Sequence, residues 1–467
     1  GLSSAIGEMA EGVGASVELS GLPLKYLGLS PWEIWLSEAQ ERMVVAVQDI
    51  EPLKEACRIY GVECTDVGEF TGDGRLVVRN NGDVIFDLDT DFLHNGRPQR
   101  HMTAAMPSPR RTEMDEAGFV SIFGDIDIVL SLQQLLRHPN ISSKEAIIHR
   151  YDYEIRGATL VRPLVGALLD GHADGVVVAE PLDAHGIAIG IGVNPWFGEQ
   201  DPERMALSVV DEAIRNVVAV GADPDKIALL DNFSWGDPRR ETTLGHLVAA
   251  VNGCCTAAVA FSAPFVSGKD SLNNEYFGSD GERHSVPPTL VITAVAHVPD
   301  ANATVTPDLK SISNVLLVLG HTSCEFGGSH LAKIMNLSDS GAVPDFDTTA
   351  PARYRTLHGA IRAGLIQSCH DVSEGGIGVA VAEMAIAGRL GVDMSSCEKA
   401  SDAQWLFSES NGRFIVEVKK EDTPEVLSLF AGESCLLGIV ADNDFLFFSN
   451  GRDVSVSELT DIWKTQQ

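Results

Sequence analysis

The sequence predicts a duplicated α/β protein, because three features recur in the same order along the chain. Residues 1–10 match residues 376–385, and residues 36–47 match residues 407–418. Each copy then carries an Asn-Gly pair, Asn81-Gly82 and Asn450-Gly451, between strand-like runs typical of a β-hairpin. Repeats of this length indicate a duplicated domain, since solenoids repeat every roughly 20–50 residues.

The first copy alternates short helices and strands. We expect an opening helix, a capped helical turn at Ser30-Pro31-Trp32-Glu33 and a helix at 52–60 that Gly61 ends. Strands are predicted at 42–47, 62–70, 76–79 and 84–88. Residues 96–143 have weak periodicity, which indicates a linker with a helix near 127–137.

A long helix follows the linker. Asp201-Pro202 offers a cap and a first-position proline to a helix that ends before Gly221. On this helix Glu212 and Asn216 lie four residues apart on one face, so they can reach a single metal ion. The alternative, two solvated residues on an exposed face, stays open on spacing alone.

Polar side chains also follow predicted strands. A strand at 227–230 leads into a loop that begins with Asp231, which is a common ligand position or else an Asx turn. A helix at 244–252 and a strand at 257–261 precede Ser-Gly-Lys-Asp-Ser-Leu at 267–272. That segment lacks the first glycine and the Ser or Thr of a Walker A loop, so a surface turn is predicted there.

The most informative stretch is His-Asp-Val-Ser-Glu-Gly-Gly at 370–376, which runs directly into an apolar helix start. A glycine-rich turn before a helix brings backbone close to a phosphate. The sequence has no HExxH, GxSxG or helix-opening GxGxxG motif. The residues alone therefore predict a duplicated α/β protein that binds a phosphate ligand through a divalent metal.

The amino-acid composition argues against several kinds of partner. The formal net charge of −32 argues against a nucleic-acid partner, because phosphate backbones are bound by clustered Lys and Arg. The 8 cysteines form no CxxC pair, which indicates reduced thiols in a cytosolic protein. No apolar run approaches the ~20 residues that span a bilayer and no signal peptide is visible, so no membrane association is expected.

Five segments carry a family resemblance: Leu-Ser-Glu-Ala-Gln-Glu-Arg-Met at 36–43, Asp-Glu-Ala-Ile-Arg-Asn at 211–216, Leu-Asp-Asn-Phe at 230–233, Ser-Gly-Lys-Asp-Ser at 267–271 and the 370–376 stretch. Together, in this order, they resemble phosphoribosylformylglycinamidine synthase, a glutamine-dependent ligase of purine biosynthesis. The resemblance implies an internally duplicated aminoimidazole ribonucleotide synthetase-like fold.

That fold implies a domain plan. We expect a first C-terminal-type domain at 1–97, a linker at 98–150, a second N-terminal-type domain at 151–310 and a second C-terminal-type domain at 311–460. The first N-terminal-type domain, with the catalytic residues, is expected upstream of residue 1. We therefore expect residues 1–467 to be inactive alone and to need that domain as a partner.

The resemblance also implies the chemistry. ATP and Mg²⁺ would drive amidation of formylglycinamide ribonucleotide through an iminophosphate, with ammonia from a glutaminase subunit or domain, in the cytoplasm. The implied site residues are Glu38, Ala39, Gln40 and Ser271 for the substrate; Asp231, Gly268, Lys269 and Ser373 for ATP; and Glu212, Asn216 and Asp371 for the metal. The alternatives are a non-catalytic nucleotide-holding scaffold half and a kinase-like member of the same superfamily. The repeat argues against the latter, because kinase-like members carry one N/C pair.

Overall fold

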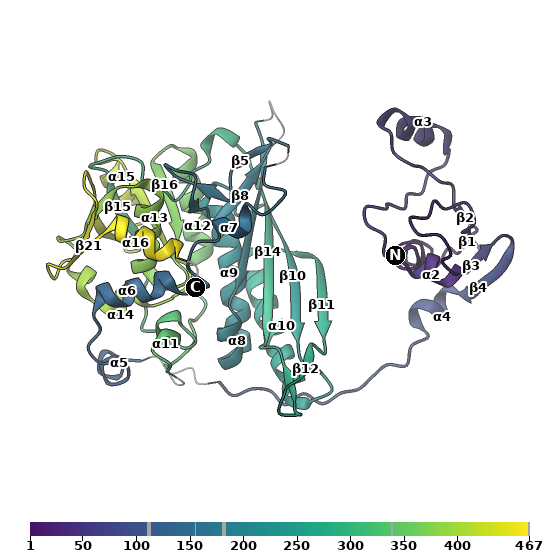
Figure 1. Cartoon of the computed structure of the whole chain (residues 1–467), viewed down its shortest axis with the longest axis horizontal. Coiled ribbons are helices and arrows are strands. Elements are labelled where there is room, and N and C mark those ends of the chain that lie inside the picture. The colour runs from purple at the N-terminus through teal and green to yellow at the C-terminus, as the bar shows by residue number, and fades with distance from the viewer. Residues whose placement is uncertain (110–113, 155, 180–183, 338–339, 466–467) are drawn as a thin grey trace. The chain divides into compact units, whose positions relative to one another are not determined.

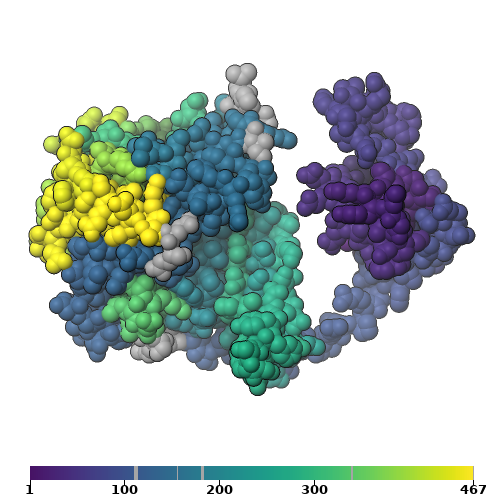
Figure 2. Space-filling view, in the orientation of Figure 1, coloured from purple at the N-terminus to yellow at the C-terminus, as the bar shows by residue number. Residues whose placement is uncertain are grey.

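The computed structural model describes residues 1–109, 114–154, 156–179, 184–337 and 340–465. The chain forms two compact units, Gly1–His101 (unit 1) and Met102–Gln467 (unit 2). Figures 1 and 2 show the chain coloured from purple at the N-terminus to yellow at the C-terminus. Each unit has its own sheets and core, and each is described by itself.

Unit 1 is a small sheet with helices around it. Its strands lie in the order β2-β1-β3-β4. Their bounds are β1 Ala15–Glu18, β2 Gly68–Phe70, β3 Arg75–Asn80 and β4 Asp83–Asp89; the helices are α1 Leu2–Met9, α2 Pro31–Leu36, α3 Glu51–Tyr60 and α4 Thr90–Asn95. Asn81 and Gly82 both have positive φ and connect β3 to antiparallel β4, which confirms the predicted hairpin. The capping box at Ser30 and the left-handed Gly61 after α3 are also present.

The predicted strand at residues 42–47 is wrong. In the internal repeat, residues 42–47 correspond to β18 of unit 2 (Phe414–Val418), which lies between β16 and β15. The sheet formed within residues 1–101, all of which the structure describes, has no strand in either of those positions. Backbone groups of a lone strand have no partners, so the segment stays irregular. Its alternate apolar side chains are open to solvent, with Met43 88% and Val45 58% exposed.

Unit 2 begins with helices α5 (Glu116–Phe123), α6 (Ile128–Arg137) and α7 (Glu145–Ile148). Helix α6 confirms the helix expected near 127–137, and Asp127 caps it. It packs against α16 (Val456–Lys464) and α13 (Gly376–Gly388), near the far end of the chain. The segment after unit 1 is therefore anchored on the C-terminal half of unit 2.

The first sheet of unit 2 has six strands among the described residues, in the order β11-β10-β14-β9-β8-β5. Their bounds are β5 Thr159–Val161, β8 Gly175–Val178, β9 Gly186–Val193, β10 Ile227–Trp235, β11 Phe265–Leu272 and β14 Thr289–Val298. Helices α9 (Pro202–Ala219) and α10 (Glu241–Phe261) pack together, and α9 packs on β9 and β14 (Figure 1). Buried and exposed residues alternate along β9, so the opposite face of the sheet is open.

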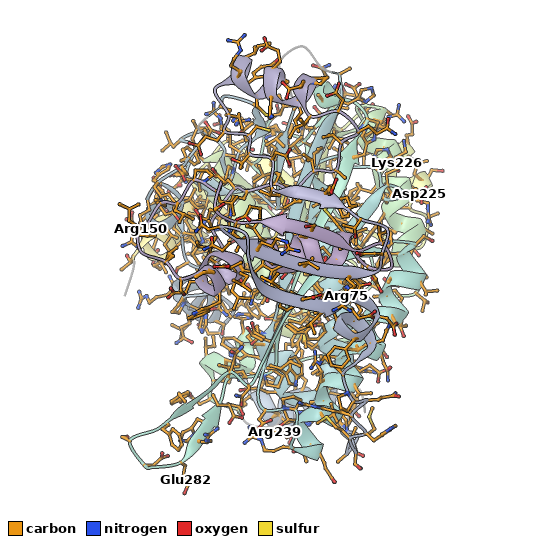
Figure 3. All side chains as sticks on the ribbon, turned by 90° about the vertical axis from the view of Figure 1, so that its right-hand side faces the viewer. Arg75, Arg150, Asp225, Lys226, Arg239 and Glu282 are labelled. Atoms are coloured by element: carbon orange, nitrogen blue, oxygen red, sulfur yellow. The ribbon has the colours of Figure 1, made fainter. Side chains whose placement is uncertain are left out.

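Short elements lie in the connections between the strands of this sheet. They are β6 Leu164–Val165, β7 Gly171–His172, β12 Glu275–Phe277, β13 Arg283–Ser285 and α8 Pro195–Gln200. Figure 3 shows Glu282 at the tip of the β12–β13 hairpin, which projects beyond the end of the sheet. Arg240 ion-pairs with Glu275 at the base of that hairpin.

Three predicted segments differ here, each because of tertiary pairing. The strand predicted at 227–230 continues to Trp235, because β11 and β14 flank it, so Asp231 lies within a strand and not in a loop. The turn predicted at 267–272 is part of β11, which pairs with β10. The strand predicted at 257–261 belongs to α10. A side chain at Gly253 would approach the Glu203 carbonyl oxygen of α9 to 2.4 Å, so this glycine permits close helix packing and does not end the helix.

Helix α10 also corrects the expectation that no apolar run approaches membrane-spanning length. Among the described residues it is long and apolar enough to cross a bilayer by length and composition. Helices α5 and α6 are long enough to cross a bilayer only if they are counted as one membrane span, and a bend of 69° separates them. In the fold α10 packs along α9.

The second sheet of unit 2 has seven strands among the described residues, in the order β16-β18-β15-β19-β17-β20-β21. Its further bounds are β15 Val315–Leu319, β16 Ile366–Asp371, β17 Gly391–Asp393, β19 Ser434–Ala441, β20 Phe445–Phe447 and β21 Asp453–Ser455; the helices are α11 His330–Ile334, α12 Ala350–Arg362, α14 Ala403–Phe407 and α15 Thr423–Leu429. The turn at Asn450-Gly451 connects β20 to antiparallel β21, as predicted.

Helix α9 joins the two sheets of unit 2. One face packs on β9 and β14, and another packs on α12 and β16. A single apolar cluster runs through this junction and includes Ile214, Tyr354 and Phe414. Polar residues of α9 are therefore held between two sheets, away from bulk water.

Candidate functional site

Helix α9 carries charged side chains into this junction. Asp201 caps the helix by accepting from the Arg204 N–H, and Pro202 occupies its first turn, as the sequence predicted. Asp211 and Arg215 are buried, at 0% and 2% exposure. A buried charge is costly unless it is paired, so each of these groups calls for a partner.

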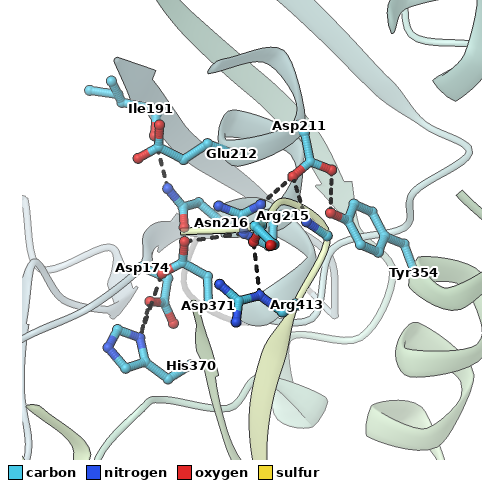
Figure 4. Close-up of polar contacts among 12 residues, drawn as sticks. Asp174, Ile191, Asp211, Glu212, Arg215, Asn216, Tyr354, His370, Asp371 and Arg413 are labelled. Carbon is cyan, nitrogen blue, oxygen red and sulfur yellow. Dashed lines mark hydrogen bonds and ion pairs between the residues drawn. The ribbon is translucent and has the colours of Figure 1, made fainter. Parts of the chain in front are cut away.

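Arg215 holds two buried carboxylates (Figure 4). Its guanidinium bonds Asp211, and its Nε lies 3.3 Å from Asp371 Oδ2. Tyr354 and the Gly412 N–H also donate to Asp211. Burial alone would lower the pKa of Arg215, but the Asp211 and Asp371 carboxylates outweigh it and raise that pKa. Asp211 is thus fully occupied by structural bonds, whereas Asp371 keeps acceptor capacity.

A second cluster surrounds the free side of Asp371. Oxygen or nitrogen atoms of Asp174, His370 and Asp371 lie within 4.8 Å of one another. His370 Nδ1 lies 2.5 Å from Asp174 Oδ1, and His370 Nε2 lies 3.2 Å from Glu383 Oε2. Both ring nitrogens of His370 therefore contact carboxylates. Figure 4 shows the contact with Asp174, which orients that side chain.

Two oxygens in this region have no hydrogen-bond partner in the described part of the chain. They are Asp174 Oδ2 and Asn216 Oδ1, both buried. Asn216 donates to the Ile191 carbonyl, which aims its amide group toward β9, and Glu212 accepts from the Val193 N–H at 2.9 Å. The two side chains share one helix face, as their spacing predicted, but that face is not the solvated one of the alternative interpretation.

The electrostatics also favour a cation. Burial raises the pKa of Asp174, and the neighbouring Asp371 carboxylate adds to that rise. Burial raises the pKa of Glu212 well above its usual value, and Glu374 and Asp371 repel its charge further. Oxygen donors of this kind suit Mg²⁺ or Ca²⁺, and a divalent ion would offset the repulsion. Asp174 and Asp371 therefore fit a divalent metal, and Glu212 and Asn216 offer further oxygen atoms from α9.

A polar pocket adjoins this cluster. It is lined by Asn194, Phe197, Ser208, Glu212, Arg215, Ser373, Glu374, Glu409 and Asn411. Ser373 and Glu374 belong to the turn that precedes α13, where Gly375 and Gly376 both have positive φ. A side chain at Gly376 would approach the Ser408 carbonyl oxygen to 2.5 Å, so only glycine fits there. The glycines of the 370–376 motif thus fold the turn over the pocket.

The other proposed nucleotide residues lie on β10 and β11. In this parallel pair Asp231 is opposite Gly268, and a side chain at Gly268 would approach the Asp231 carboxylate to 2.1 Å. Burial raises the pKa of Asp231, and Asp270 adds to it. Lys269 Nζ donates to Ser271 Oγ at 2.9 Å. The structure thus pairs Asp231 with Gly268 and Lys269 with Ser271, whereas Ser373 lies in the pocket with Glu212.

The remaining three predicted residues lie in unit 1. Glu38, Ala39 and Gln40 follow α2 in an irregular segment and are exposed. Arg42 donates to the Ser37 carbonyl and folds this segment back toward α2. The segment offers backbone and side-chain polar groups to a ligand, but within unit 1 no second element closes over it.

Sequence reasoning missed Asp174 and assigned no role in the site to His370. Asp174 stands between the short strands β7 and β8, where neither periodicity nor a motif distinguishes it from other carboxylates. Only the fold brings it to Asp371, across nearly two hundred residues of chain. His370 was adjacent to the predicted ligand Asp371, and its own bonds to Asp174 and Glu383 could not be read from spacing.

Sequence families match most of the chain. The family "AIR synthase related protein, C-terminal domain" matches residues 1–81 and 312–446, and "AIR synthase related protein, N-terminal domain" matches residues 171–298. The C-terminal family thus occurs twice, which agrees with the internal repeat. The chain belongs to the AIR synthase related proteins.

Within these proteins the resemblance seen in the sequence is confirmed. The chain is 31% identical, over 99% of its length, to the phosphoribosylformylglycinamidine synthase subunit PurL of Thermococcus sibiricus. It spans 62% of that relative.

Solved structures share the fold. "T. maritima PurL complexed with ADP" matches with a TM-score of 0.62 at 19% identity, over 94% of this chain and 62% of that one. "T. maritima PurL complexed with FGAR" matches with a TM-score of 0.53 at 17% identity, over 73% of this chain and 55% of that one. The aminoimidazole ribonucleotide synthetase-like fold expected from the sequence is therefore confirmed.

Proposed function

We propose that this chain supplies part of an enzyme that amidates formylglycinamide ribonucleotide in purine biosynthesis, in the cytoplasm. The observation that carries the proposal is the similarity to a PurL subunit along 99% of the chain. T. maritima PurL has been solved with ADP, ATP and FGAR, which supports a nucleotide and a ribonucleotide substrate. The relative is named as a subunit, which supports a further chain in the assembly. We propose that this further chain or domain is a glutaminase that provides ammonia from glutamine.

The reaction has two steps. The formamide oxygen of the substrate attacks the γ-phosphorus of ATP, ADP leaves, and an iminophosphate forms. Ammonia then adds to the imine carbon, and phosphate leaves to give the amidine. Such transfers need positioned donors and positive charge around the transferring phosphoryl group.

Four strand residues are proposed to serve ATP and the substrate. Asp231 and Gly268 are proposed to face the nucleotide together, because the glycine lets the Asp231 carboxylate lie directly against the backbone of β11. Lys269 supplies a cation for a phosphate, and its bond to Ser271 holds both on one side of β11. Ser271 then offers its hydroxyl to the substrate. Within unit 1, Glu38, Ala39 and Gln40 are proposed separately as substrate-binding residues.

The buried cluster is proposed to hold a second nucleotide. Asp174, Glu212, Asn216 and Asp371 would bind Mg²⁺, and Ser373 would donate to a phosphate at the pocket. When bound, Mg²⁺ supplies positive charge between nucleotide phosphates and these carboxylates. The cluster lies between α9 and β16, where a nucleotide would be held by the fold, and such a nucleotide would give this site a scaffold role, the second candidate function.

The proposed activity can be tested by reconstitution. We expect residues 1–467 with ATP, formylglycinamide ribonucleotide and ammonium to form no amidine, and we expect product once the first N-terminal-type domain of a PurL relative is co-expressed. Asp231→Asn should lower kcat at least about 100-fold in that complex, since the residue faces ATP. Product formed by residues 1–467 alone would contradict the proposal that the chain needs a partner domain. Absence of product from the complex, with nucleotide still bound, would favour the scaffold.

The open face of the six-stranded sheet supports this partner. Along β9 the exposed side chains are all apolar, with Ile187 49%, Ile189 38%, Ile191 51% and Val193 36% exposed. A row of such residues on a sheet whose other face is covered by helices indicates an interface. We propose that a second N-terminal-type sheet packs there, and that two copies of this chain pair by the same face when that domain is absent.

The pairing can be measured directly. Ile189→Glu should convert a dimer of the isolated chain into a monomer in light scattering, because burying an unpaired carboxylate costs several kcal/mol. The matched control is Val259→Glu on α10, which is 80% exposed on the helix layer and should leave the dimer intact. If the molar mass of the dimer is unchanged in Ile189→Glu, the contact between the two copies does not involve this face of the sheet.

A further inference from the structure

Two thiols meet in the seven-stranded sheet, away from the sites described above. Cys397 follows β17, where its N–H donates to the Met394 carbonyl at 2.9 Å, and Cys435 is the second residue of β19. Strands β17 and β19 are antiparallel neighbours. The two thiols are close enough to interact electrostatically; Cys397 belongs to the apolar cluster under this sheet, and Cys435 packs against that cluster.

The two cysteines differ in access and in charge. Cys397 is 6% exposed, whereas Cys435 is half-buried at the surface. The neighbouring Cys397 thiol lowers the pKa of Cys435, and the Lys399 ammonium lowers it further. The accessible member of the pair is thus the better nucleophile, and the protected member stands next to it.

We propose that Cys435 and Cys397 form a reversible disulfide when the protein meets a low-molecular-weight disulfide such as oxidised glutathione. The Cys435 thiolate attacks one sulfur of glutathione disulfide, and one glutathione thiolate leaves. The Cys397 thiol then loses its proton and attacks the Cys435 sulfur, and the second glutathione leaves. Two protein thiols are oxidised by two electrons, and one glutathione disulfide is reduced to two thiols.

The position of the bond gives it a structural consequence. Cys397 begins the segment that runs through α14 to Glu409, which lines the pocket and accepts from the Gly375 N–H at 2.9 Å. A disulfide would fix the start of this segment to β19. The modification site therefore lies at one end of a pocket wall.

Peptide mass spectrometry after alkylation tests the proposal. In oxidised glutathione at pH 7 the wild-type chain should yield a Cys397–Cys435 crosslink. Cys397→Ser should instead trap a glutathione adduct on Cys435, and Cys435→Ser should leave Cys397 unmodified. With iodoacetamide, Cys435 should react roughly tenfold faster than the exposed Cys255, and Lys399→Met should slow Cys435 several-fold.

The outcomes separate the possibilities. A crosslink in wild type with an adduct in Cys397→Ser supports the proposal, because it assigns the attacking and resolving thiols. Adducts on Cys255 without any change at Cys435 would overturn it. So would a crosslink that survives in Cys435→Ser through another cysteine. Serine replaces the sulfur with similar volume, and circular dichroism checks that each variant is folded.

Discussion

Replacing Arg215 by methionine is expected to lower the free energy of unfolding by about 3–5 kcal/mol. Methionine keeps much of the volume of arginine but removes the charge that Asp211 and Asp371 share. Asp211 is 0% exposed, so its carboxylate would stay buried without a counter-charge or would take up a proton. Breaking one side of a buried ion pair costs far more than the intact pair contributes.

Urea unfolding followed by circular dichroism measures this loss. The matched control is Arg355→Met, because Arg355 pairs with Asp225 at the surface with side-chain exposures of 44% and 57%. That variant should lose at most about 1 kcal/mol. Asp211→Asn placed in the Arg215→Met background should recover part of the loss, since it removes the stranded charge. Equal losses in Arg215→Met and Arg355→Met would show that the junction tolerates an unpaired carboxylate.

Local signals in the sequence predicted the elements whose stability is local. The Asp201-Pro202 start of α9, the Ser30 capping box and the Asn81-Gly82 hairpin need only a few neighbouring residues, and each is present. The internal repeat in the sequence is also visible as a repeated strand pairing in the structure. In both copies the strand after the first helix pairs in parallel with the first strand of the Asn-Gly hairpin, as β1 with β3 and β17 with β20.

Elements that depend on distant partners were misjudged. Residues 42–47 have the pattern of a strand but no neighbouring strands within unit 1, whereas residues 267–272 look like a turn yet gain β10 as a neighbour. The end of α10 is rich in Ala and Val, and packing on α9 decides in favour of helix. Propensity in such segments is weaker than tertiary pairing.

In the candidate site, too, local features could be predicted from the sequence, whereas contacts between distant residues could not. Helical spacing placed Glu212 and Asn216 together, and the glycine pair after Ser373 indicated a tight turn over a ligand. Asp174 could not be found this way, because its neighbours in the cluster come from a strand nearly two hundred residues later. Its unpartnered Oδ2 atom became visible only when burial and hydrogen bonds were considered together.

Asp174→Asn gives the sharpest test of this cluster, because ligand binding and stability should change differently. The variant should raise the Kd for Mg²⁺-ADP at least about 100-fold, since it removes a charged ligand and disturbs the oriented His370. It should leave the free energy of unfolding of the ligand-free chain nearly unchanged, because burial and the Asp371 charge raise the pKa of Asp174 by more than the His370 contact lowers it. Isothermal titration with Mg²⁺-ADP measures the first quantity, and urea unfolding measures the second.

Asp280→Asn on the β12–β13 hairpin is the matched control, because that exposed carboxylate lies outside the cluster, and it should leave both quantities unchanged. Wild type should gain about 2.7 kcal/mol of stability at a ligand concentration 100 times its Kd, and Asp174→Asn should lose nearly all of that gain. Unchanged affinity would remove Asp174 from the metal site. A variant that binds poorly because it is also unstable would assign Asp174 a structural role instead. Only a buried carboxylate that is unfavourable by itself and needed by a cation gives weak binding with full stability.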